Sequence, residues 1–336
     1  MNPMQKPITI HDNAREAGVS SSTVSRVLNG NVPVAPEKRD AVLAIVQKLQ
    51  YRPNVIAQGL ARGRTAAIGV MTQSVASPFY GEILRGVEQG LAGSGYHPVF
   101  ASGNWRTEEE LAAFDLLSGR RVDGLIVLAG VIPDDRLLRG AAELPLVVVG
   151  RLIKGLEPQC LYVDDARAAQ EATRYLIELG HQRIAHIAGP ATHQDALDRR
   201  EGYRRALAEA GLPPNEQLIV EGDYTEQSGL LAVQSLLSRN VLFTAIFAAN
   251  DQMAYGVRLA LYRHGIRVPD DISLVGFDDL LGSAYTTPPL TTIRHPSFDM
   301  GRAAAHTVLE LLAGRSIQPS PLATSLVVRE SAALRR

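Results

Sequence analysis

A short N-terminal stretch of this chain concentrates side chains that can hydrogen-bond to phosphates and to the edges of bases. Residues 20–26 read Ser-Ser-Ser-Thr-Val-Ser-Arg, so five hydroxyl groups precede one guanidinium. Hydroxyl groups commonly hold phosphate oxygens, and an arginine can bind both acceptors on the edge of a guanine. This chemistry predicts a contact with nucleic acid, provided that a rigid element presents these side chains together.

The surrounding sequence predicts such an element, because two short helical patterns meet at Gly18. Thr9 and Asp12 have the spacing of a capping box at the start of the first helix, and Ser20 can cap the second. A third helix is expected to begin at Pro36. This layout is typical of a helix-turn-helix, which places its second helix in the major groove of DNA. Apolar residues at helical spacing would form its small core: Ile10, Ala14, Ala17, Val24, Val27, Leu28, Val42, Ile45, Val46 and Leu49.

The charge distribution separates this N-terminal segment from the remainder of the chain. Residues 1–64 hold nine Lys and Arg against four Asp and Glu, a net charge of +5, whereas the whole chain carries −1. A basic head on an acidic body fits a DNA-binding function. The alternative is a small helical bundle with a solvated basic face, and the hydroxyl-rich outer face of the second helix favours DNA binding over it.

Three motifs give the chain a resemblance to the LacI/GalR family of bacterial transcription repressors. They are Ala-Arg-Glu-Ala-Gly-Val-Ser at 14–20, Thr-Val-Ser-Arg-Val-Leu-Asn at 23–29 and Tyr-Arg-Pro-Asn at 51–54. The resemblance implies an N-terminal all-α helix-turn-helix headpiece. It implies an α/β body like a periplasmic binding protein, built of two doubly wound parallel-sheet subdomains. It also implies a homodimer that binds a near-palindromic operator in double-stranded DNA, with a small sugar effector held between the subdomains.

The resemblance assigns roles in DNA binding to residues of the head and of the segment that follows it. Ser21 and Ser22 correspond to positions that read bases, and Arg26 is the expected reader of a guanine. Leu60 matches a leucine that wedges into the minor groove, although a flexible linker with one exposed leucine is the alternative. The other expected DNA contacts are Thr9, Ser20, Thr23, Ser25, Asn29, Tyr51, Asn54 and Gln58.

Two departures from the family pattern predict a head of modest stability. Asn13 stands where the family usually has valine, so that a polar amide would press on the small core. Ala35 precedes Pro36 where the family usually offers a serine cap, and loss of a cap costs about 1 kcal/mol.

The segment after Ala66 alternates apolar runs with helical patterns, which predicts parallel sheets covered by helices on both faces. Ligands of such sheets bind beyond the carboxyl ends of the strands. The expected strands are 68–71, 99–101, 125–128, 146–149, 184–188, 219–220, 245–248 and 274–277. The expected helices lie near 79–93, 107–118, 165–180, 200–210, 227–238 and 251–264.

The resemblance also implies the domain boundaries. We expect a headpiece at 1–52, a hinge helix or linker at 53–64 and an effector-binding and dimerisation body at 65–336. The chain is expected to cross between subdomains near Val163, Thr292 and Thr324. The expected subdomains are 65–163 with 293–324, and 164–292 with 325–336.

Polar and aromatic side chains that follow the expected strand ends are the candidate ligand contacts. Sugar hydroxyls both donate and accept, so amides, carboxylates and a bidentate arginine can satisfy them, while an aromatic face covers the C–H side of a pyranose. Structural alternatives are a surface ion pair for Arg199, core packing for Phe79 and loop support for His295. The candidate effector-binding residues are Phe79, Asn104, Arg199, Tyr224, Asn250, Asp278 and His295.

The segments 103–104, 150–157 and 195–199 most resemble the galactose-repressor branch of the family. That likeness implies galactose, a galactoside or a β-glucoside as the effector. Gly150 departs from the polar residue that the family often carries there, which removes one partner for a hydroxyl. Release of DNA on sugar binding is the commoner mode in this family.

The remaining features bear on location, assembly and cofactors. The single Cys160 excludes an internal disulfide and suits a reducing compartment. The chain has no apolar run of membrane-spanning length and its N-terminus lacks a signal-peptide core, so we expect a cytoplasmic, nucleoid-associated protein. The short tail at 330–336 has no leucine heptads, which predicts a dimer and not a tetramer. We expect no cofactor and no metal.

Two other classes of protein, a glycosidase and a sugar-transport protein, would explain part of the sequence. A glycosidase could use the adjacent carboxylates Asp164–Asp165 or Asp278–Asp279, but adjacent side chains on a strand or loop point apart. The sequence also has no G-x-S-x-G, phosphate-loop, G-x-G-x-x-G or H-E-x-x-H motif. A sugar-transport protein would explain the body but not the head. We therefore expect a regulator and not an enzyme.

Overall fold

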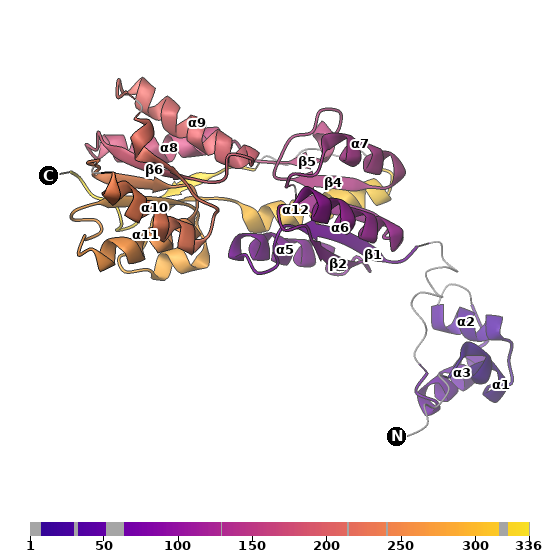
Figure 1. Ribbon diagram of the computed structural model, residues 1–336. Coiled ribbons are helices and arrows are strands. Elements are labelled where there is room, and N and C mark those ends of the chain that lie inside the picture. Colours follow the sequence, from indigo (N-terminus) through magenta and orange to yellow (C-terminus); the bar gives the residue numbers. More distant parts are fainter. Residues whose placement is uncertain are drawn as a thin grey trace. The chain divides into compact units, whose positions relative to one another are not determined.

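The computed structural model describes residues 8–29, 33–51, 64–128, 130–213, 215–239, 241–315 and 322–335. The chain divides into two compact units, residues 1–66 and residues 67–336 (Figure 1). Each unit has hydrophobic core residues of its own.

The N-terminal unit contains three short helices. They are α1 (Ile10–Glu16), α2 (Ser21–Asn29) and α3 (Pro36–Lys48). The predicted capping box is confirmed, because the Thr9 hydroxyl accepts from the Asp12 amide while the Asp12 carboxylate accepts from the Thr9 amide. Gly18 makes the turn between α1 and α2 at φ +63°, in the left-handed region that favours glycine. The core is small, with Ala14, Val24 and Val42 buried at its centre.

Both expected weaknesses of this head are confirmed. Asn13 is completely buried, and its Nδ2 donates to the Thr9 carbonyl at 3.0 Å while its Oδ1 has no hydrogen-bond partner within the described part of the chain. Ala35 precedes α3 without any side-chain cap. The unpaired buried oxygen lowers the free energy of unfolding of the head, and its small apolar core offers few contacts to offset that loss.

The body begins with a parallel sheet of strand order β2-β1-β3-β4-β5. Its strands are β1 (Ala67–Thr72), β2 (His97–Ser102), β3 (Gly124–Leu128), β4 (Leu146–Val149) and β5 (Cys160–Leu161). One core lies between this sheet and the helices α5 (Pro78–Leu91) and α12 (Ser297–Leu312). A second core lies on the other face of this sheet, between the sheet and the helices α6 (Thr107–Gly119) and α7 (Asp134–Glu143).

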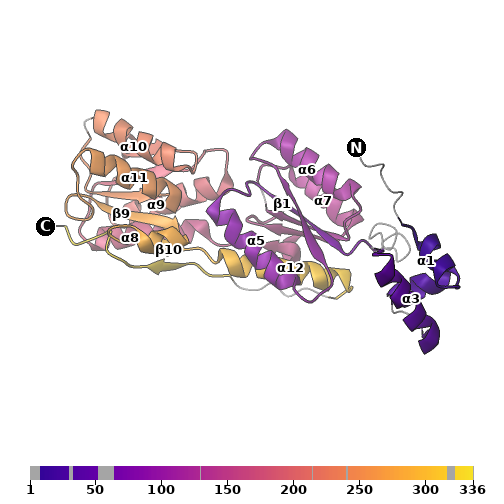
Figure 2. The same cartoon turned by 90° about the horizontal axis from the view of Figure 1, so that it is seen from below.

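Helices α5 and α12 lie side by side although they are far apart in the sequence (Figure 2). Glycines permit the close approach: a Cβ on Gly86 would lie 2.1 Å from the Phe298 carbonyl oxygen, and one on Gly301 would lie 2.0 Å from that of Ile83. This contact attaches a late segment of the chain to the first sheet.

The second sheet has the order β11-β10-β9-β8-β6-β7 and is parallel except for β11. Its strands are β6 (Ile184–Ala188), β7 (Ile219–Glu221), β8 (Ala245–Ala248), β9 (Ser273–Asp278), β10 (Thr291–Arg294) and β11 (Ser325–Val327). The helices α10 (Glu226–Ser238) and α11 (Asp251–Arg263) cover one face. The helices α8 (Asp165–Glu178) and α9 (Gln194–Glu209) cover the other. The predicted fold class, an α-helical head with a body of two parallel sheets covered on both faces, is confirmed.

The structure also contains elements that the sequence did not predict. These are α7, α12, β5, β10 and β11, and α9 begins at Gln194 where we expected a start near residue 200. Strand β10 runs to Arg294, two residues beyond the expected crossing near Thr292. None of the described helices is both long enough and apolar enough to cross a lipid bilayer.

Candidate functional site

A cavity of about 300 Å³ lies at the carboxyl ends of parallel strands from both sheets. The first half of the body contributes Ser74, Ala76, Ser77, Phe79, Tyr80 and Trp105. The second half contributes Asp195, Arg199, Asp223, Tyr224, Thr225, Asn250, Gln252 and Asp278. An adjoining space of about 70 Å³ shares part of this wall and is also lined by Gly150, Arg151, Asp165 and His295. Loops and helices from both halves of the body thus line one cavity.

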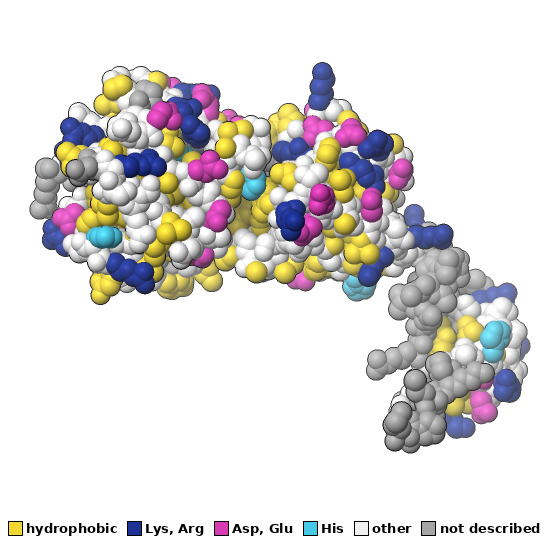
Figure 3. All heavy atoms as spheres, viewed as in Figure 1, with side chains coloured by type: hydrophobic (Ala, Val, Ile, Leu, Met, Phe, Trp, Pro, Cys, Tyr) yellow, Lys and Arg dark blue, Asp and Glu magenta, His cyan; other side chains and the backbone are white. Residues whose placement is uncertain are grey.

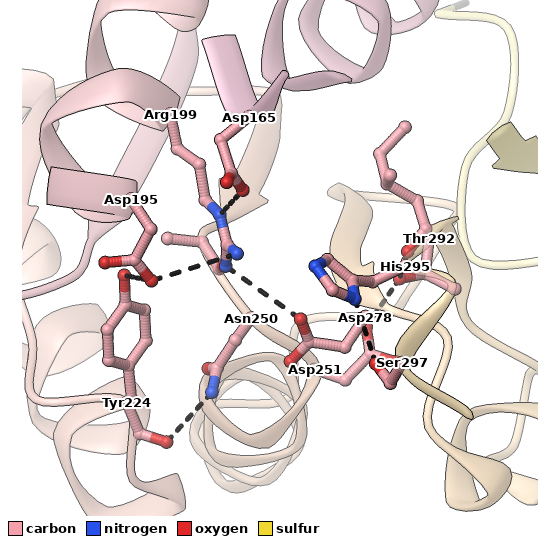
Figure 4. A network of polar contacts seen from close by, with 12 residues as sticks. Asp165, Asp195, Arg199, Tyr224, Asn250, Asp251, Asp278, Thr292, His295 and Ser297 are labelled. Carbon is pink, nitrogen blue, oxygen red and sulfur yellow. Dashed lines mark hydrogen bonds and ion pairs between the residues drawn. The ribbon is translucent and has the colours of Figure 1, made fainter. Parts of the chain in front are cut away.

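Arg199 is the charged centre of this wall, and only 4 % of its surface is exposed. Its Nε donates to Asp165 Oδ1 at 2.8 Å, and its Nη1 donates to the Ala249 carbonyl at 2.6 Å (Figure 4). The guanidinium carbon lies 3.8 Å from the centroid of the Phe277 ring. The alternative of a surface ion pair is therefore wrong, because the ion pair that Arg199 makes with Asp165 is buried.

Three carboxyl groups surround this one guanidinium. Besides Asp165, Asp195 Oδ2 lies 3.9 Å from Nη2 and Asp278 Oδ1 lies 3.9 Å from Nη1 of Arg199. Burial raises the pKa of Asp165 to about 6 and that of Asp278 well above its usual range, although Arg199 opposes both shifts. Burial by itself would lower the pKa of Arg199, but the carboxylates, led by Asp165, raise it. A carboxyl group that keeps its proton can donate a hydrogen bond as well as accept one.

Tyr224 and Asn250 border the cavity on the second half of the body. Tyr224 has φ +67°, and its phenol donates to Asp195 Oδ2 at 2.9 Å. Asn250 caps α11, since its Oδ1 accepts from the Met253 amide at 2.9 Å and its Nδ2 donates to the Tyr224 carbonyl at 3.0 Å. A carboxamide has two donor and two acceptor positions, so each end of Asn250 retains capacity for a ligand.

Phe79 and His295 lie together, with ring centroids 5.0 Å apart and an angle of 69° between the planes. Phe79 lines the cavity and also packs against the core of the first sheet. His295 lines the adjoining space, and its Nδ1 lies 2.9 Å from Ser297 Oγ. Burial lowers the pKa of His295 to about 3, which keeps the ring neutral.

Asn104 lies outside the cavity, contrary to our expectation. Its side chain is exposed, and its Nδ2 donates to Glu109 Oε2 at 2.7 Å. Asn104 and Trp105 both have positive φ, +51° and +58°, so the turn after β2 brings Trp105 to the cavity in place of Asn104. The turn after β2 therefore contributes Trp105 to the cavity, and not Asn104.

The candidate set left out several residues that line the cavity or the adjoining space, among them Tyr80, Trp105, Asp165 and Asp195. Asp195 lies one helical turn before Arg199, and a helix start at Gln194 would have placed the two on the same face. Tyr80 follows Phe79 at the beginning of α5, so its position after a strand end was the available signal.

Four candidate DNA contacts of the head lie at the start of α2, namely Ser20, Ser21, Ser22 and Thr23. Ser20 Oγ lies 2.7 Å from Ser22 Oγ and 2.9 Å from Thr23 Oγ1, and it accepts from the Thr23 amide at 3.2 Å. Arg26 is exposed further along the same helix. Thr9 is exposed, Ser21, Ser25 and Tyr51 are half-buried, and Asn29 is the last residue of α2. The remaining candidates lie outside the described residues: Asn54, Gln58 and Leu60.

Comparison with known proteins agrees with both units. Residues 9–54 match the family model for bacterial regulatory proteins of the lacI family, and residues 173–332 match a periplasmic binding protein-like domain. The chain is 40 % identical to the HTH-type transcriptional regulator GalR of Salmonella typhimurium, over 93 % of this chain and 91 % of that protein. The chain belongs to the LacI family.

Solved structures agree with this assignment. The lac repressor dimer bound to operator and the anti-inducer ONPF has a TM-score of 0.87 and 31 % identity, covering 98 % of this chain and 100 % of that chain. The complex of the transcriptional regulator CelR with cellobiose has a TM-score of 0.72 and 36 % identity, covering 97 % and 100 %. This LacI-family chain is therefore a DNA-binding transcriptional regulator and not an enzyme, because the matched relatives are regulators.

The geometry also disfavours the glycosidase alternative. Asp279 is turned toward two arginines, and its oxygens accept from Arg294 at 2.7 Å and from Arg329 at 2.6 Å. Only its neighbour Asp278 lines the cavity. The two adjacent carboxylates thus face different surroundings and cannot act as acid and base on one bound sugar.

Proposed function

We propose that this LacI-family regulator is a repressor whose affinity for its operator is controlled by a small sugar bound in the cavity of the body. The observation that carries this proposal is the composition of the cavity wall. Arg199, Asp278 and Asn250 supply buried hydrogen-bonding groups, and Phe79 and Tyr224 supply aromatic rings. His295 adds a neutral ring at the adjoining space.

The chemistry of that wall fits a sugar better than an apolar ligand. A sugar ring has hydroxyl groups around its edge and C–H groups on its faces, so it needs donors, acceptors and aromatic surface together. A wall of this kind discriminates strongly, because a ligand without the matching hydroxyl groups leaves buried polar atoms unpaired. The cavity volume of about 300 Å³ is at the lower end of the roughly 300–1,000 Å³ that ligand sites occupy.

Within the sugars, we propose galactose, a galactoside or a β-glucoside. The likeness to GalR supports the first two classes, and the cellobiose held by the related CelR supports the third. Gly150 borders the adjoining space without a side chain, so it offers no partner to a hydroxyl there.

For the DNA half of the function, we propose a homodimer on a near-palindromic operator, as in the lac repressor dimer. Ser21, Ser22 and Arg26 are assigned to bases, and Leu60 to the minor groove. On the face of the body shown in Figure 3, basic and acidic side chains are interspersed, which leaves the basic head as the better partner for phosphates. The protein would act in the cytoplasm on chromosomal DNA. The remaining assigned contacts are Thr9, Ser20, Thr23, Ser25, Asn29, Tyr51, Asn54 and Gln58.

Coupling between the two functions requires that the sugar bind one arrangement of the two halves of the body more tightly than another. Without that difference in affinity a ligand shifts no equilibrium, however tightly it binds. The lining of the cavity supports such a difference, because Phe79 and Trp105 come from one half while Arg199 and Tyr224 come from the other. A change in their relative position alters the contacts that the sugar can make.

The test is a thermal-unfolding screen of the intact protein against galactose, glucose, matched galactosides and β-glucosides, ribose, gluconate and purines. A ligand at a hundred times its dissociation constant stabilises the folded state by about 2.7 kcal/mol. We expect the unfolding temperature to rise with one sugar class only. Adding that sugar should also abolish binding to the operator. A shift with purines alone, or with none of these compounds, would contradict the sugar assignment.

A further inference from the structure

Two stacked rings join the two halves of the body, and one of them, that of Trp105, lines the cavity. Trp105 follows β2 in the first half, and His193 precedes α9 in the second. Their ring centroids lie 3.7 Å apart, with 16° between the planes. Tyr80 lies 6.3 Å from Trp105, and Tyr224 lies 5.9 Å from His193. A row of aromatic rings thus crosses from one half to the other.

Trp105 is fixed to the first sheet by its backbone. Its amide donates to Gln73 Oε1 at 2.9 Å, and Gln73 Nε2 donates to the Leu128 carbonyl at 2.9 Å. Gln73 is completely buried where β1 ends, so it ties the turn after β2 to strands β1 and β3. The backbone that carries the indole is therefore held in place independently of the second half.

His193 is buried with one of its ring nitrogens unpaired in the described part of the chain. Only 8 % of its surface is exposed, and its Nδ1 has no hydrogen-bond partner among the described residues. Burial lowers the pKa of His193, although Asp195 opposes this, so the ring stacks in its neutral form. Because an unpaired buried nitrogen is unfavourable and would gain water if the rings separated, the stack is a contact that can open.

We propose that the Trp105–His193 stack sets the size limit of the effector. It holds the two halves together over a ligand with one sugar ring, and a ligand with a second ring has to break it. Trp105 borders both the main cavity and the adjoining space, so the indole limits how far a ligand can extend. This inference rests on the proposed sugar-binding function and narrows it. Galactose, or a galactoside or β-glucoside with a small aglycone, would fit beneath the stack, whereas a disaccharide such as the cellobiose of CelR would not fit without opening it.

The stack can be tested without any ligand, because Trp105 is the only tryptophan in the chain. Its fluorescence in the intact protein is quenched with acrylamide, and wild type is compared with His193→Ala and with the exposed-site control His264→Ala. We expect a severalfold larger quenching constant in His193→Ala and no change in the control. Equal quenching in all three proteins would overturn the proposal, because the rings would then not cover each other in solution.

The size limit is tested with matched sugar pairs, galactose with lactose and glucose with cellobiose, by calorimetric titration of the same proteins. In wild type we expect the monosaccharide of the preferred pair to bind at least about tenfold more tightly, a difference of about 1.4 kcal/mol. His193→Ala should reduce that ratio to near unity. His193→Phe should retain it, since it keeps a flat ring and removes the unpaired nitrogen.

The outcomes separate this inference from the function on which it rests. Wild-type protein that binds the disaccharide as tightly as the monosaccharide overturns the size limit and leaves sugar control standing. An unchanged ratio in His193→Ala overturns the role of the stack. Binding of no sugar by either protein overturns both the sugar assignment and the size limit.

Discussion

Asp165 Oδ1 accepts a hydrogen bond from Arg199 Nε at 2.8 Å, which joins the first turn of α8 to α9 beside the cavity. Both side chains are buried: 9 % of the Asp165 side chain and 5 % of the Arg199 side chain is exposed. Asp165 follows directly on the segment that leads from β5 of the first sheet into α8 of the second half. The pair therefore couples the wall of the cavity to a connection between the two halves.

Removal of Asp165 is predicted to destabilise the body strongly. Asp165→Ala leaves a buried guanidinium without its nearest carboxylate, and breaking a buried ion pair in this way costs about 3–5 kcal/mol. Asp165→Asn keeps an acceptor for Nε and should cost less. The measurement is urea unfolding of the intact protein followed by circular dichroism.

The matched control is the exposed pair of Asp135 and Arg139, whose side chains are each 66 % exposed. Asp135→Ala should change the free energy of unfolding by less than about 1 kcal/mol, because water screens such a pair. Similar losses in the two alanine variants would show that burial does not give the Asp165–Arg199 pair its importance.

The strands of the body were the most predictable part of the fold. Buried parallel strands consist of nearly continuous apolar residues, so β6 and β8 were predicted with the observed bounds. Strand β5 has two residues and β11 has three, which is too short for any periodicity. The first turn of α9 is polar around Asp195, so its helical start is stabilised by contacts that the sequence alone does not reveal.

The candidate site was predictable where residues follow a strand end, because parallel strands bring their carboxyl ends to one edge. Asn250 and Asp278 border the cavity for this reason, whereas Arg199 lies within α9 and was predicted from the resemblance to the family. Asn104 does not, because a positive φ at two successive residues decides which side chain of its turn faces inward. The ion pair of Arg199 with Asp165 depends on how α8 packs on α9, which is tertiary information.

Asn13→Val is predicted to stabilise the head. The valine removes the unpaired Oδ1 from the core at the cost of one hydrogen bond to the Thr9 carbonyl. Because an unpaired buried polar group costs about 1–3 kcal/mol and a hydrogen bond contributes about 0.5–1.5 kcal/mol, we expect a net gain near 1 kcal/mol.

The gain at Asn13 can be measured by hydrogen exchange of the α1 and α2 amides in the intact protein. The exposed-site control is Gln47→Val on α3, which places the same side chain in water and should give no gain. Protection that rises equally in both variants would mean that valine acts through general hydrophobicity and not through the buried amide.

His186 is predicted to make the body sensitive to acid. Its ring stacks between Tyr203 and Phe247, and its Nδ1 lies 3.0 Å from the Phe247 carbonyl oxygen. Burial lowers the pKa of His186 from 6.5 to about 4. Between these values the unfolded chain binds the proton and the folded chain does not. This contribution to stability is complete above pH 6.5 and is lost as the pH falls to about 4, a change of about 3 kcal/mol.

The variant His186→Phe keeps a stacked ring that cannot titrate, so its stability relative to wild type should increase as the pH falls. Urea unfolding at about pH 7 and about pH 4.5 measures the difference. The exposed-site control is His264→Phe, for which no such change is expected. A constant difference between His186→Phe and wild type at both pH values would refute this assignment.

Asp251 is predicted to change the stability of the body with pH in the opposite direction to His186, over an overlapping range of pH. Burial raises its pKa from 3.8 to about 7, although the hydroxyls of Ser283 and Thr292 donate to its oxygens. The folded chain then binds the proton that the unfolded chain has lost, so this contribution to stability is lost as the pH rises from 3.8 to about 7. In His186→Phe, where only Asp251 of this pair still titrates, stability should therefore fall more steeply with rising pH than in wild type.

Arg26→Ala is predicted to relax the sequence preference of the head at one position of the operator half-site. Arg26 is exposed on α2, the helix that enters the major groove in a helix-turn-helix. Loss of a bidentate contact with guanine would cost about 1–3 kcal/mol of discrimination against other bases, whereas loss of a phosphate contact would weaken binding to all sequences alike.

The role of Arg26 can be measured by selecting binding sites from a randomised library and then titrating the selected sites by fluorescence anisotropy. The comparison variant is Arg15→Ala, which removes an exposed arginine of α1 and should weaken binding to all sequences alike while reducing its salt dependence. If Arg26→Ala lowers affinity uniformly, as Arg15→Ala is expected to, then Arg26 holds a phosphate, and sequence must be read by Ser21 and Ser22.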